Sequence, residues 1–169
     1  MKEVERPVFD PGSPDTPEIA ALLQKGLAFH RQGQLGVAMQ IYNKILQRDR
    51  SHFHALQLLA TIYAQIKQYE LALKLFDEAL QINKTNAAVF NNRGSALKEL
   101  QRFDDALASY DEALRIKPDH AEALYNRGNA LKELKRFDDA LRSYDEALRI
   151  KRDFAEALYN RGNALQELN

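Results

Sequence analysis

The stretch Asn126–Ile150, NRGNALKELKRFDDALRSYDEALRI, occurs almost twice more in this chain. Thirty-four residues earlier the chain reads NRGSALKELQRFDDALASYDEALRI, and thirty-four residues later it reads NRGNALQELN. By direct count, residues 87–120 and 121–154 are identical at 25 of 34 positions, and residues 121–135 and 155–169 at 13 of 15. A fixed period of this length predicts a row of repeated units, each of which packs mainly on its neighbours.

Composition excludes several classes of protein. The 169 residues contain 24 Lys plus Arg and 24 Asp plus Glu, so the formal net charge is zero. The overall charge therefore gives no reason to expect binding to nucleic acid or to anionic membranes. The absence of cysteine excludes disulfides and thiolate metal sites. The N-terminal residues contain no apolar signal segment, and no apolar run is long enough to span a membrane. We therefore expect a soluble, cytoplasmic protein.

The first 17 residues differ from the rest of the chain. They hold four of the five prolines, so we expect residues 1–17 to form an extended leader. Val8 and Phe9 offer an alternative, in which the leader docks on the repeats as a strap. Thr16 can cap the first helix, and Pro17 suits its first turn. The repeat domain then runs over residues 18–169.

Each unit reads as two helices joined by a short turn. In the first unit, Gly33 interrupts the helical pattern, and a second helix is predicted from about Leu35 to Arg48. The repeats are placed at 19–52, 53–86, 87–120 and 121–154, with one unpaired helix at 155–169.

Small and aromatic residues recur at fixed positions when each unit is numbered from 1 at residues 19, 53, 87, 121 and 155. Position 8 is Gly26, Ala60, Gly94, Gly128 and Gly162; position 20 is Ala38, Ala72, Ala106 and Ala140; position 24 is Tyr42, Phe76, Tyr110 and Tyr144. Small residues let two helices approach closely, and the aromatic ring fills the remaining space.

This pattern resembles the tetratricopeptide repeat over about 150 of the 169 residues. It is similar to bacterial arrays of this repeat and to the repeat arm of O-GlcNAc transferase-like proteins. The resemblance implies an all-α, right-handed superhelix of four helix–turn–helix repeats plus one terminal helix. Two positions depart from the family pattern, since position 4 is Leu or Phe rather than Trp, and position 7 is Arg in three units rather than Leu.

One face of each first helix is not needed for packing. An α-helix turns about 100° per residue, so positions 4, 7, 8 and 11 form the packing stripe and positions 2, 6, 9 and 13 lie opposite. Position 6 is asparagine in three successive units: Asn92, Asn126 and Asn160. A carboxamide both donates and accepts hydrogen bonds, so a ladder of them can hold a peptide backbone. The pattern is similar to the asparagine ladder in the repeat arm of O-GlcNAc transferases, where it holds substrate peptides. The alternative is that these amides bond only within the repeats.

The predicted peptide-binding set extends this ladder with neighbouring positions on the first helices. It comprises Asn92, Asn126, Asn160, Ser95, Asn129, Asn163, Tyr125, Tyr159, Lys98, Lys132 and Glu122. Tyr125 and Tyr159 also suit partial packing. The arginines at position 7 are expected to reach an acidic residue of the neighbouring unit.

Other clusters are assigned to the surface. Acidic pairs recur on the second helices with bases four residues later, as in Asp138–Arg142, Asp145–Arg149 and Asp111–Arg115, which is the spacing of helix-surface ion pairs. His52 and His54 lack a third ligand nearby. We expect no catalytic site, no metal site and no cofactor.

The last predicted helix repeats the packing stripe of the fourth unit. The stripe is made by Leu158, Gly162, Leu165 and Leu168, which correspond to Leu124, Gly128, Leu131 and Leu134. We expect a protein-interaction scaffold that binds an extended peptide or a partner protein. The alternatives are the arm of a larger enzyme, such as a glycosyltransferase, and a self-assembling module that dimerises through residues 155–169.

Overall fold

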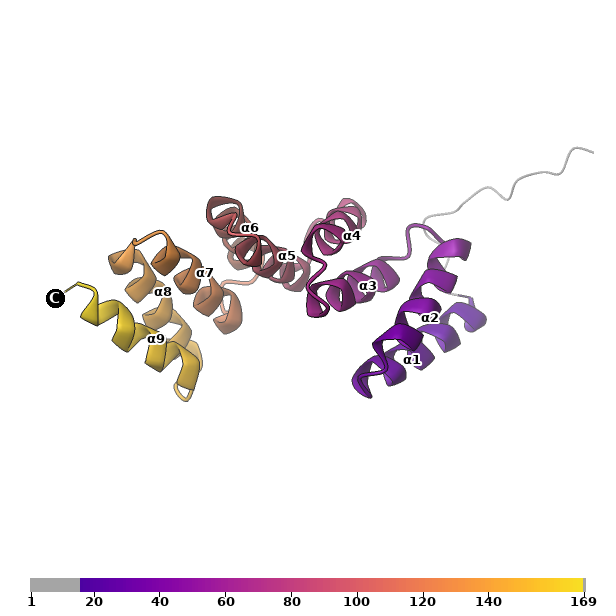
Figure 1. Cartoon of the computed structure of the whole chain (residues 1–169), viewed down its shortest axis with the longest axis horizontal. Helices are drawn as coiled ribbons and strands as arrows, with labels where there is room; N and C mark the ends of the chain where they lie inside the picture. Colours follow the sequence, from indigo (N-terminus) through magenta and orange to yellow (C-terminus); the bar gives the residue numbers. More distant parts are fainter. Residues whose placement is uncertain (1–15, 169) are drawn as a thin grey trace, which may run out of the picture.

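The computed structural model describes residues 16–168, and this part of the chain is helical throughout (Figure 1). Its nine helices are α1 (Pro17–Arg31), α2 (Leu35–Arg48), α3 (Phe53–Gln65), α4 (Tyr69–Ile82), α5 (Ala87–Glu99), α6 (Phe103–Ile116), α7 (Ala121–Glu133), α8 (Phe137–Ile150) and α9 (Ala155–Gln166). The predicted all-α fold of four helix–turn–helix repeats and one further helix is confirmed. The predicted leader and its strap residues Val8 and Phe9 lie outside the described residues.

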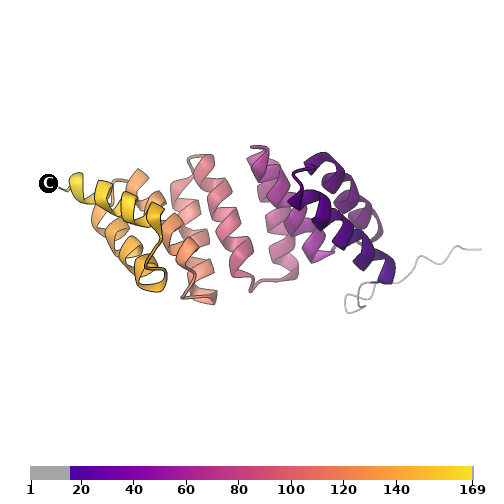
Figure 2. The same cartoon turned by 90° about the horizontal axis from the view of Figure 1, so that it is seen from below.

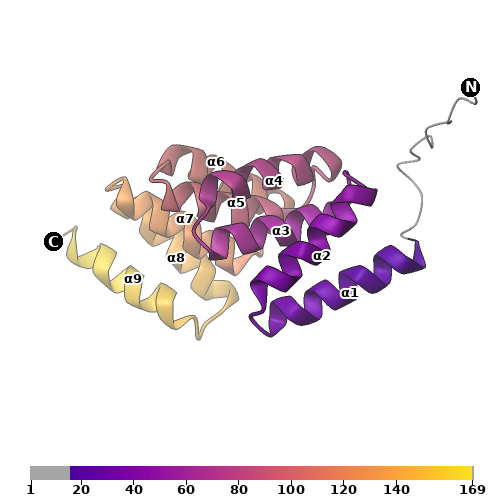
Figure 3. The ribbon, with the colours of Figure 1, turned by 45° about the vertical axis from the view of Figure 1, so that its right-hand side comes forward.

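The helices stack in a row, with α1 and α9 at opposite ends (Figures 1 and 2). The row is bowed, with α4 and α6 along its outer edge (Figure 3). Besides packing on the helices next to them in sequence, the first helices contact one another directly, α3 with α5, α5 with α7, and α7 with α9. The first helices therefore line the inner side of the row. None of the described helices is both long and apolar enough to cross a membrane.

Helix starts follow local sequence signals. The Thr16 hydroxyl accepts a hydrogen bond from the Ile19 N–H at 3.4 Å, as expected for the cap of α1. Asn86 caps α5 in the same way, since its Oδ1 accepts from the Val89 N–H at 3.0 Å. These side chains satisfy backbone donors that the first helical turn leaves without a partner.

The turn inside each repeat needs one residue in the left-handed region. Gly33 has φ 73°, and the residues at the same position of the next three units, Lys67, Gln101 and Lys135, have φ 61°, 59° and 59°. Of these four residues only Gly33, a glycine, adopts a positive φ without strain. The turn geometry is therefore imposed by the packing of the two helices that it joins.

The core of each repeat is built on the contact between positions 8 and 24. A Cβ atom added to Gly26, Gly94 or Gly128 would lie 2.5–2.6 Å from the ring of the tyrosine at position 24 of the same unit. In the second unit alanine replaces glycine at position 8, and Phe76 replaces tyrosine. All four rings are fully buried. The glycine requirement thus comes from the ring that packs against it.

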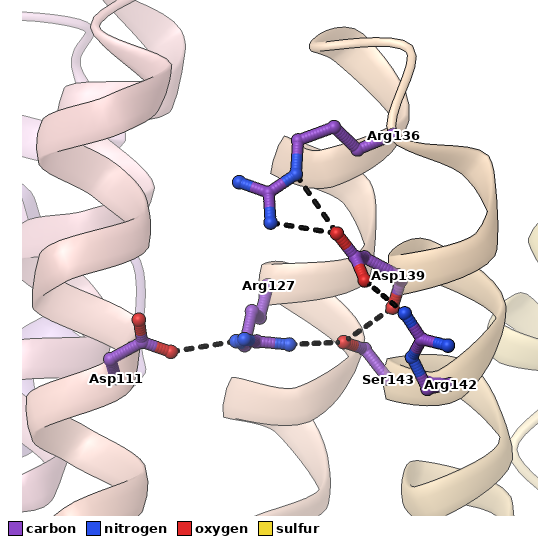
Figure 4. A network of polar contacts seen from close by, with 6 residues as sticks. All are labelled: Asp111, Arg127, Arg136, Asp139, Arg142 and Ser143. Atoms are coloured by element: carbon purple, nitrogen blue, oxygen red, sulfur yellow. Dashed lines mark hydrogen bonds and ion pairs between the residues drawn. The ribbon is translucent and has the colours of Figure 1, made fainter.

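Arginines at position 7 join consecutive repeats. The Arg127 guanidinium on α7 donates to Asp111 Oδ1 on α6 at 2.7 Å and to Ser143 Oγ on α8 at 2.7 Å (Figure 4). Arg93 makes the same two bonds one repeat earlier, and Arg161 pairs with Asp145 at 2.5 Å. The prediction that these arginines reach an acidic residue of the neighbouring unit is confirmed.

The ion pairs on the second helices differ from the predicted ones. Arg142 pairs with Asp139 rather than Asp138, and Asp139 also accepts from Arg136 (Figure 4). Arg115 pairs with Glu112 at 2.9 Å, because Asp111 is bonded to Arg127 of the next repeat. The predicted spacing of four residues is wrong here, and for Asp111 and Asp145 the reason is that an arginine of the next repeat binds the same carboxylate.

Candidate peptide-binding groove

Two hollows lie between first helices on the inner side of the row. The α3–α5 hollow has a volume of about 290 Å³ and is lined by Asn92 and Ser95 of the predicted set. The second, which we name the α5–α7 hollow, has a volume of about 400 Å³. Its lining includes four residues of that set: Lys98, Asn129, Lys132 and Asn160. We refer to these six residues and the two hollows together as the inner groove.

The asparagines at position 6 link consecutive first helices. Asn126 Nδ2 donates to Asn91 Oδ1 at 3.0 Å. Asn160 Nδ2 donates to the Tyr125 hydroxyl at 3.1 Å and to Asn129 Oδ1 at 3.0 Å. The expectation that packing makes no use of these amides is therefore wrong. One repeat step places position 6 of a first helix beside positions 5 and 9 of the preceding first helix.

These bonds leave part of each amide for a ligand. Among residues 16–168, the bonds of Asn126 and Asn160 use the Nδ2 atom, so the carbonyl Oδ1 atom is the one that can accept from an incoming donor. Asn92 is half-buried, lines the α3–α5 hollow and accepts a longer bond of 3.5 Å from Asn91. Asn92 and Asn160 line the two hollows and can present hydrogen-bond acceptors to them, whereas Asn126 lines neither hollow.

In the third and fourth units the side chain at position 9 accepts a hydrogen bond from the buried tyrosine at position 24. Tyr144 donates to Asn129 Oδ1 at 2.8 Å, and Tyr110 donates to Ser95 Oγ at 3.4 Å. In the first unit this position is Leu27, and the buried Tyr42 hydroxyl has no hydrogen-bond partner in the described part of the chain. Ser95 and Asn129 are therefore structural residues as well as groove-lining residues. Asn163 holds the same position in α9 and is half-buried.

Burial makes these phenols weak acids. It raises the pKa of Tyr110 to about 12, although the hydrogen bond with Ser95 acts in the opposite direction. Burial likewise raises the pKa values of Tyr144 and Tyr42. The three hydroxyls stay protonated near neutral pH, and those of Tyr110 and Tyr144 serve as hydrogen-bond donors.

The two tyrosines at position 5 differ in environment. Tyr125 is half-buried, with its ring centre 4.9 Å from that of Phe154 and 6.1 Å from that of Tyr144. Tyr159 is 72% exposed. Tyr125 therefore contributes to packing, whereas Tyr159 presents its ring to solvent.

The charged members of the predicted set lie along the same helices. Lys98 pairs with Glu99 at 2.8 Å, and Glu122 is exposed near the start of α7. The rim of the α5–α7 hollow combines Lys98 and Lys132 with Glu99 and Glu133. No single sign of charge dominates this part of the groove. Among residues 16–168, no cluster of side chains has the composition of a metal site.

The predicted self-association residues lie on α9, except Leu168, which follows the end of that helix. Leu158, Leu165 and Leu168 are 52%, 38% and 45% exposed, and nothing lies within 4 Å of a Cβ built on Gly162. In the preceding repeat, Leu124 is 4% exposed and Leu131 is fully buried. Nearly identical sequences therefore have very different surroundings.

Sequence reasoning missed several residues that line the groove or support it. Asn91 is only 6% exposed, and it bonds Asn126 from the preceding first helix. Gln65 and Tyr69 line the α3–α5 hollow. Asn91 and Asn126 are separated by one repeat plus one residue, and that spacing between two carboxamides is a signal that could have identified the pair.

Comparisons with known proteins agree with this architecture. Two family models, both described as tetratricopeptide repeat, match residues 29–93 and 85–153. No curated protein matches the sequence.

Several solved structures share the fold. The crystal structure of MamA protein superposes with a TM-score of 0.80 at 21% identity, covering 88% of this chain and 81% of that one. The pilF protein of Pseudomonas aeruginosa superposes with a TM-score of 0.81 at 25% identity, covering 88% of this chain and 68% of that one. The Arabidopsis OM64 TPR domain superposes with a TM-score of 0.65 at 25% identity, covering 66% of this chain and 93% of that one.

Proposed function

The chain belongs to the tetratricopeptide repeat family, and from that premise we propose that its inner groove binds an extended segment of a partner protein. At the coarser level the fold is that of a protein-interaction scaffold. The observation that carries the finer proposal is the position of the predicted residues. Six of them, contributed by three successive first helices, line two hollows on the same side of the row.

The chemistry of the groove favours contacts with peptide backbone. Oδ1 of Asn160, which lines the α5–α7 hollow, can accept from backbone N–H groups, which every residue except proline provides. An extended ligand advances about 3.3 Å per residue and keeps these groups accessible along its length. Because lysine and glutamate alternate on the rim, affinity depends on hydrogen bonds and shape rather than on net charge.

Selection from a library of random 12-residue peptides, displayed on phage, tests this function. Peptides that bind the full chain are synthesised and labelled, and their dissociation constants are measured by fluorescence anisotropy. We expect the double variant Asn92→Ala, Asn160→Ala to bind them about tenfold more weakly, since two hydrogen-bonding groups that line the hollows are lost. Its stability should fall by about 1–2 kcal/mol, because the bonds from Asn160 to Tyr125 and Asn129 are also lost.

The matched control is Arg142→Ala, which removes an exposed side chain from the second helix α8. Its binding should equal that of the natural chain. A selection without binding peptides, or equal affinity of the double variant, would contradict the proposed function.

A second candidate function is self-association through α9. Leu158 on α9 is 52% exposed, whereas its counterpart Leu124 on α7 packs against Ala147 of α8, and Leu168 just beyond α9 is also exposed. A second copy of the chain that covers these two exposed leucines would form a dimer. Sedimentation analysis should then show a dimer that Leu158→Glu converts into monomer, whereas Glu156→Lys, on the same helix, leaves it intact. A chain that sediments as a monomer at all concentrations tested excludes this function.

A further inference from the structure

We propose that the α3–α5 hollow binds one large apolar side chain of the ligand peptide, whereas the α5–α7 hollow receives a polar one. This inference rests on the proposed function and adds the kind of residue that the ligand must carry. The two hollows are formed by equivalent backbone positions of successive repeats, but the side chains at these positions differ in chemistry.

The two hollows are built from the same positions of successive units. Positions 12, 13 and 17 of one unit and positions 9 and 13 of the next line both of them. In the α3–α5 hollow these are Ala64, Gln65, Tyr69, Ser95 and Glu99, and in the α5–α7 hollow they are Lys98, Glu99, Phe103, Asn129 and Glu133. A ligand that follows the groove therefore passes two comparable hollows in turn.

Position 12 makes the main chemical difference. At this position Ala64 contributes only a methyl group to the α3–α5 hollow, whereas Lys98 brings a long charged side chain to the α5–α7 hollow. Ala96 and the rings of Tyr69 and Phe76 complete the apolar wall, and Phe76 is fully buried beneath it. The α3–α5 hollow is thus lined mainly by carbon.

Two of the polar side chains that line this hollow, Gln65 and Glu99, already have partners. Gln65 Oε1 lies 3.1 Å from His30 Nε2 of the preceding first helix, and Glu99 pairs with Lys98 at 2.8 Å. A charged ligand group placed here would lose hydration without gaining a new opposite charge. An apolar side chain loses nothing by this burial and gains from leaving water.

The size of the α3–α5 hollow fits a single side chain. Its volume of about 290 Å³ is at the small end of the range for ligand pockets. Burying a leucine, methionine or phenylalanine side chain strengthens binding about ten- to a hundredfold. We therefore expect the peptide to carry one such residue where it crosses α3 and α5, with a polar residue towards α7.

The test uses the random 12-residue peptides selected on the full natural chain. Their sequences should share one position enriched in leucine, isoleucine, methionine or phenylalanine. Ala64→Lys should lower the affinity for the synthesised peptides at least about tenfold, because it fills the apolar hollow with a charged side chain. Lysine at this position is compatible with the fold, since Lys98 and Lys132 occupy it in the next two units.

The matched control is Ala108→Lys, which adds the same charge at an exposed position of the second helix α6. It should bind the peptides as the natural chain does. Ala64→Gln serves as a second variant if Ala64→Lys lowers the melting temperature, and it should also weaken binding, because it places an amide in the hollow.

The outcomes separate the two proposals. Binding peptides without an enriched apolar position, or full affinity in both Ala64 variants, would overturn the apolar hollow and leave the groove function standing. Peptides with the enriched position that lose affinity in Ala64→Lys but not in Ala108→Lys support it. A selection that yields no binding peptide would overturn the groove function itself, and the apolar hollow with it.

Discussion

At the scale of single residues, glycine at position 8 is required only where a tyrosine of the second helix packs against it. A Cβ at Gly128 would lie 2.5 Å from the buried Tyr144 ring, whereas one at Gly162 would meet nothing within 4 Å. We expect Gly128→Ala to destabilise the fold by about 1–3 kcal/mol through overpacking. Gly162→Ala should instead stabilise α9 by about 0.5–1 kcal/mol, because alanine is the better helix former. Denaturant unfolding of the two variants checks both signs, and equal effects would contradict this explanation.

The buried tyrosine hydroxyls provide a second comparison between equivalent residues. Tyr144 donates to Asn129, whereas the Tyr42 hydroxyl is buried without a partner. We expect Tyr144→Phe to lower the free energy of unfolding by about 1 kcal/mol, since a buried hydrogen bond is lost. Tyr42→Phe should be neutral or stabilising, because it removes a polar group that the fold leaves unsatisfied. Thermal melting of the two variants distinguishes them, and a larger loss in Tyr42→Phe would show that its hydroxyl has a role in stability.

At the scale of helices, Arg93 and Arg127 at position 7 each connect three helices with one side chain. Arg127 joins α7 to α6 through Asp111 and to α8 through Ser143, whereas Arg142 pairs only within α8, with Asp139 (Figure 4). We expect Arg127→Gln to cost about 1 kcal/mol of stability, since one partner, Ser143, is buried and the ion pair is partly exposed.

Arg142→Gln is the matched control for this prediction. Its side chain is 72% exposed, so its loss should change stability far less. The measurement is urea unfolding at low and high salt. Equal losses in the two variants would mean that the link between repeats adds nothing beyond a surface ion pair.

At the scale of the whole molecule, buried phenols make the array sensitive to alkali. Burial raises the pKa of Tyr110 from its ordinary value of 10.0 to about 12. A group with a raised pKa in the folded state contributes stability that is fully present below the unfolded value and is lost as pH rises towards the folded one. We therefore expect unfolding to become easier between pH 10 and 12, in parallel with phenolate absorbance.

The variant Tyr110→Phe separates this effect from the titration of lysines over the same range. It should lose less stability than the natural chain between pH 10 and 12, as measured by urea unfolding at each pH. Identical pH dependence of the two proteins would exclude Tyr110 as a cause.

Local signals explain why the fold was predictable from sequence. The second helix predicted from about Leu35 to Arg48 is α2, Leu35–Arg48, because Gly33 and the helical period are both encoded within a few residues. The partners of the position-6 amides were not predictable in the same way. Asn126 bonds Asn91 from another repeat, and that contact depends on how far one first helix is offset from the next.

The amino-acid sequence by itself determined the repeat, the helices and six of the residues that line the inner side. Tertiary structure alone decided which of them are bonded and which are exposed. Leu124 and Leu158 occupy the same position in nearly identical helices, yet they are 4% and 52% exposed. The physical reason is that burial is a property of the surface opposite, and among the described residues α8 covers α7 while no second helix follows α9.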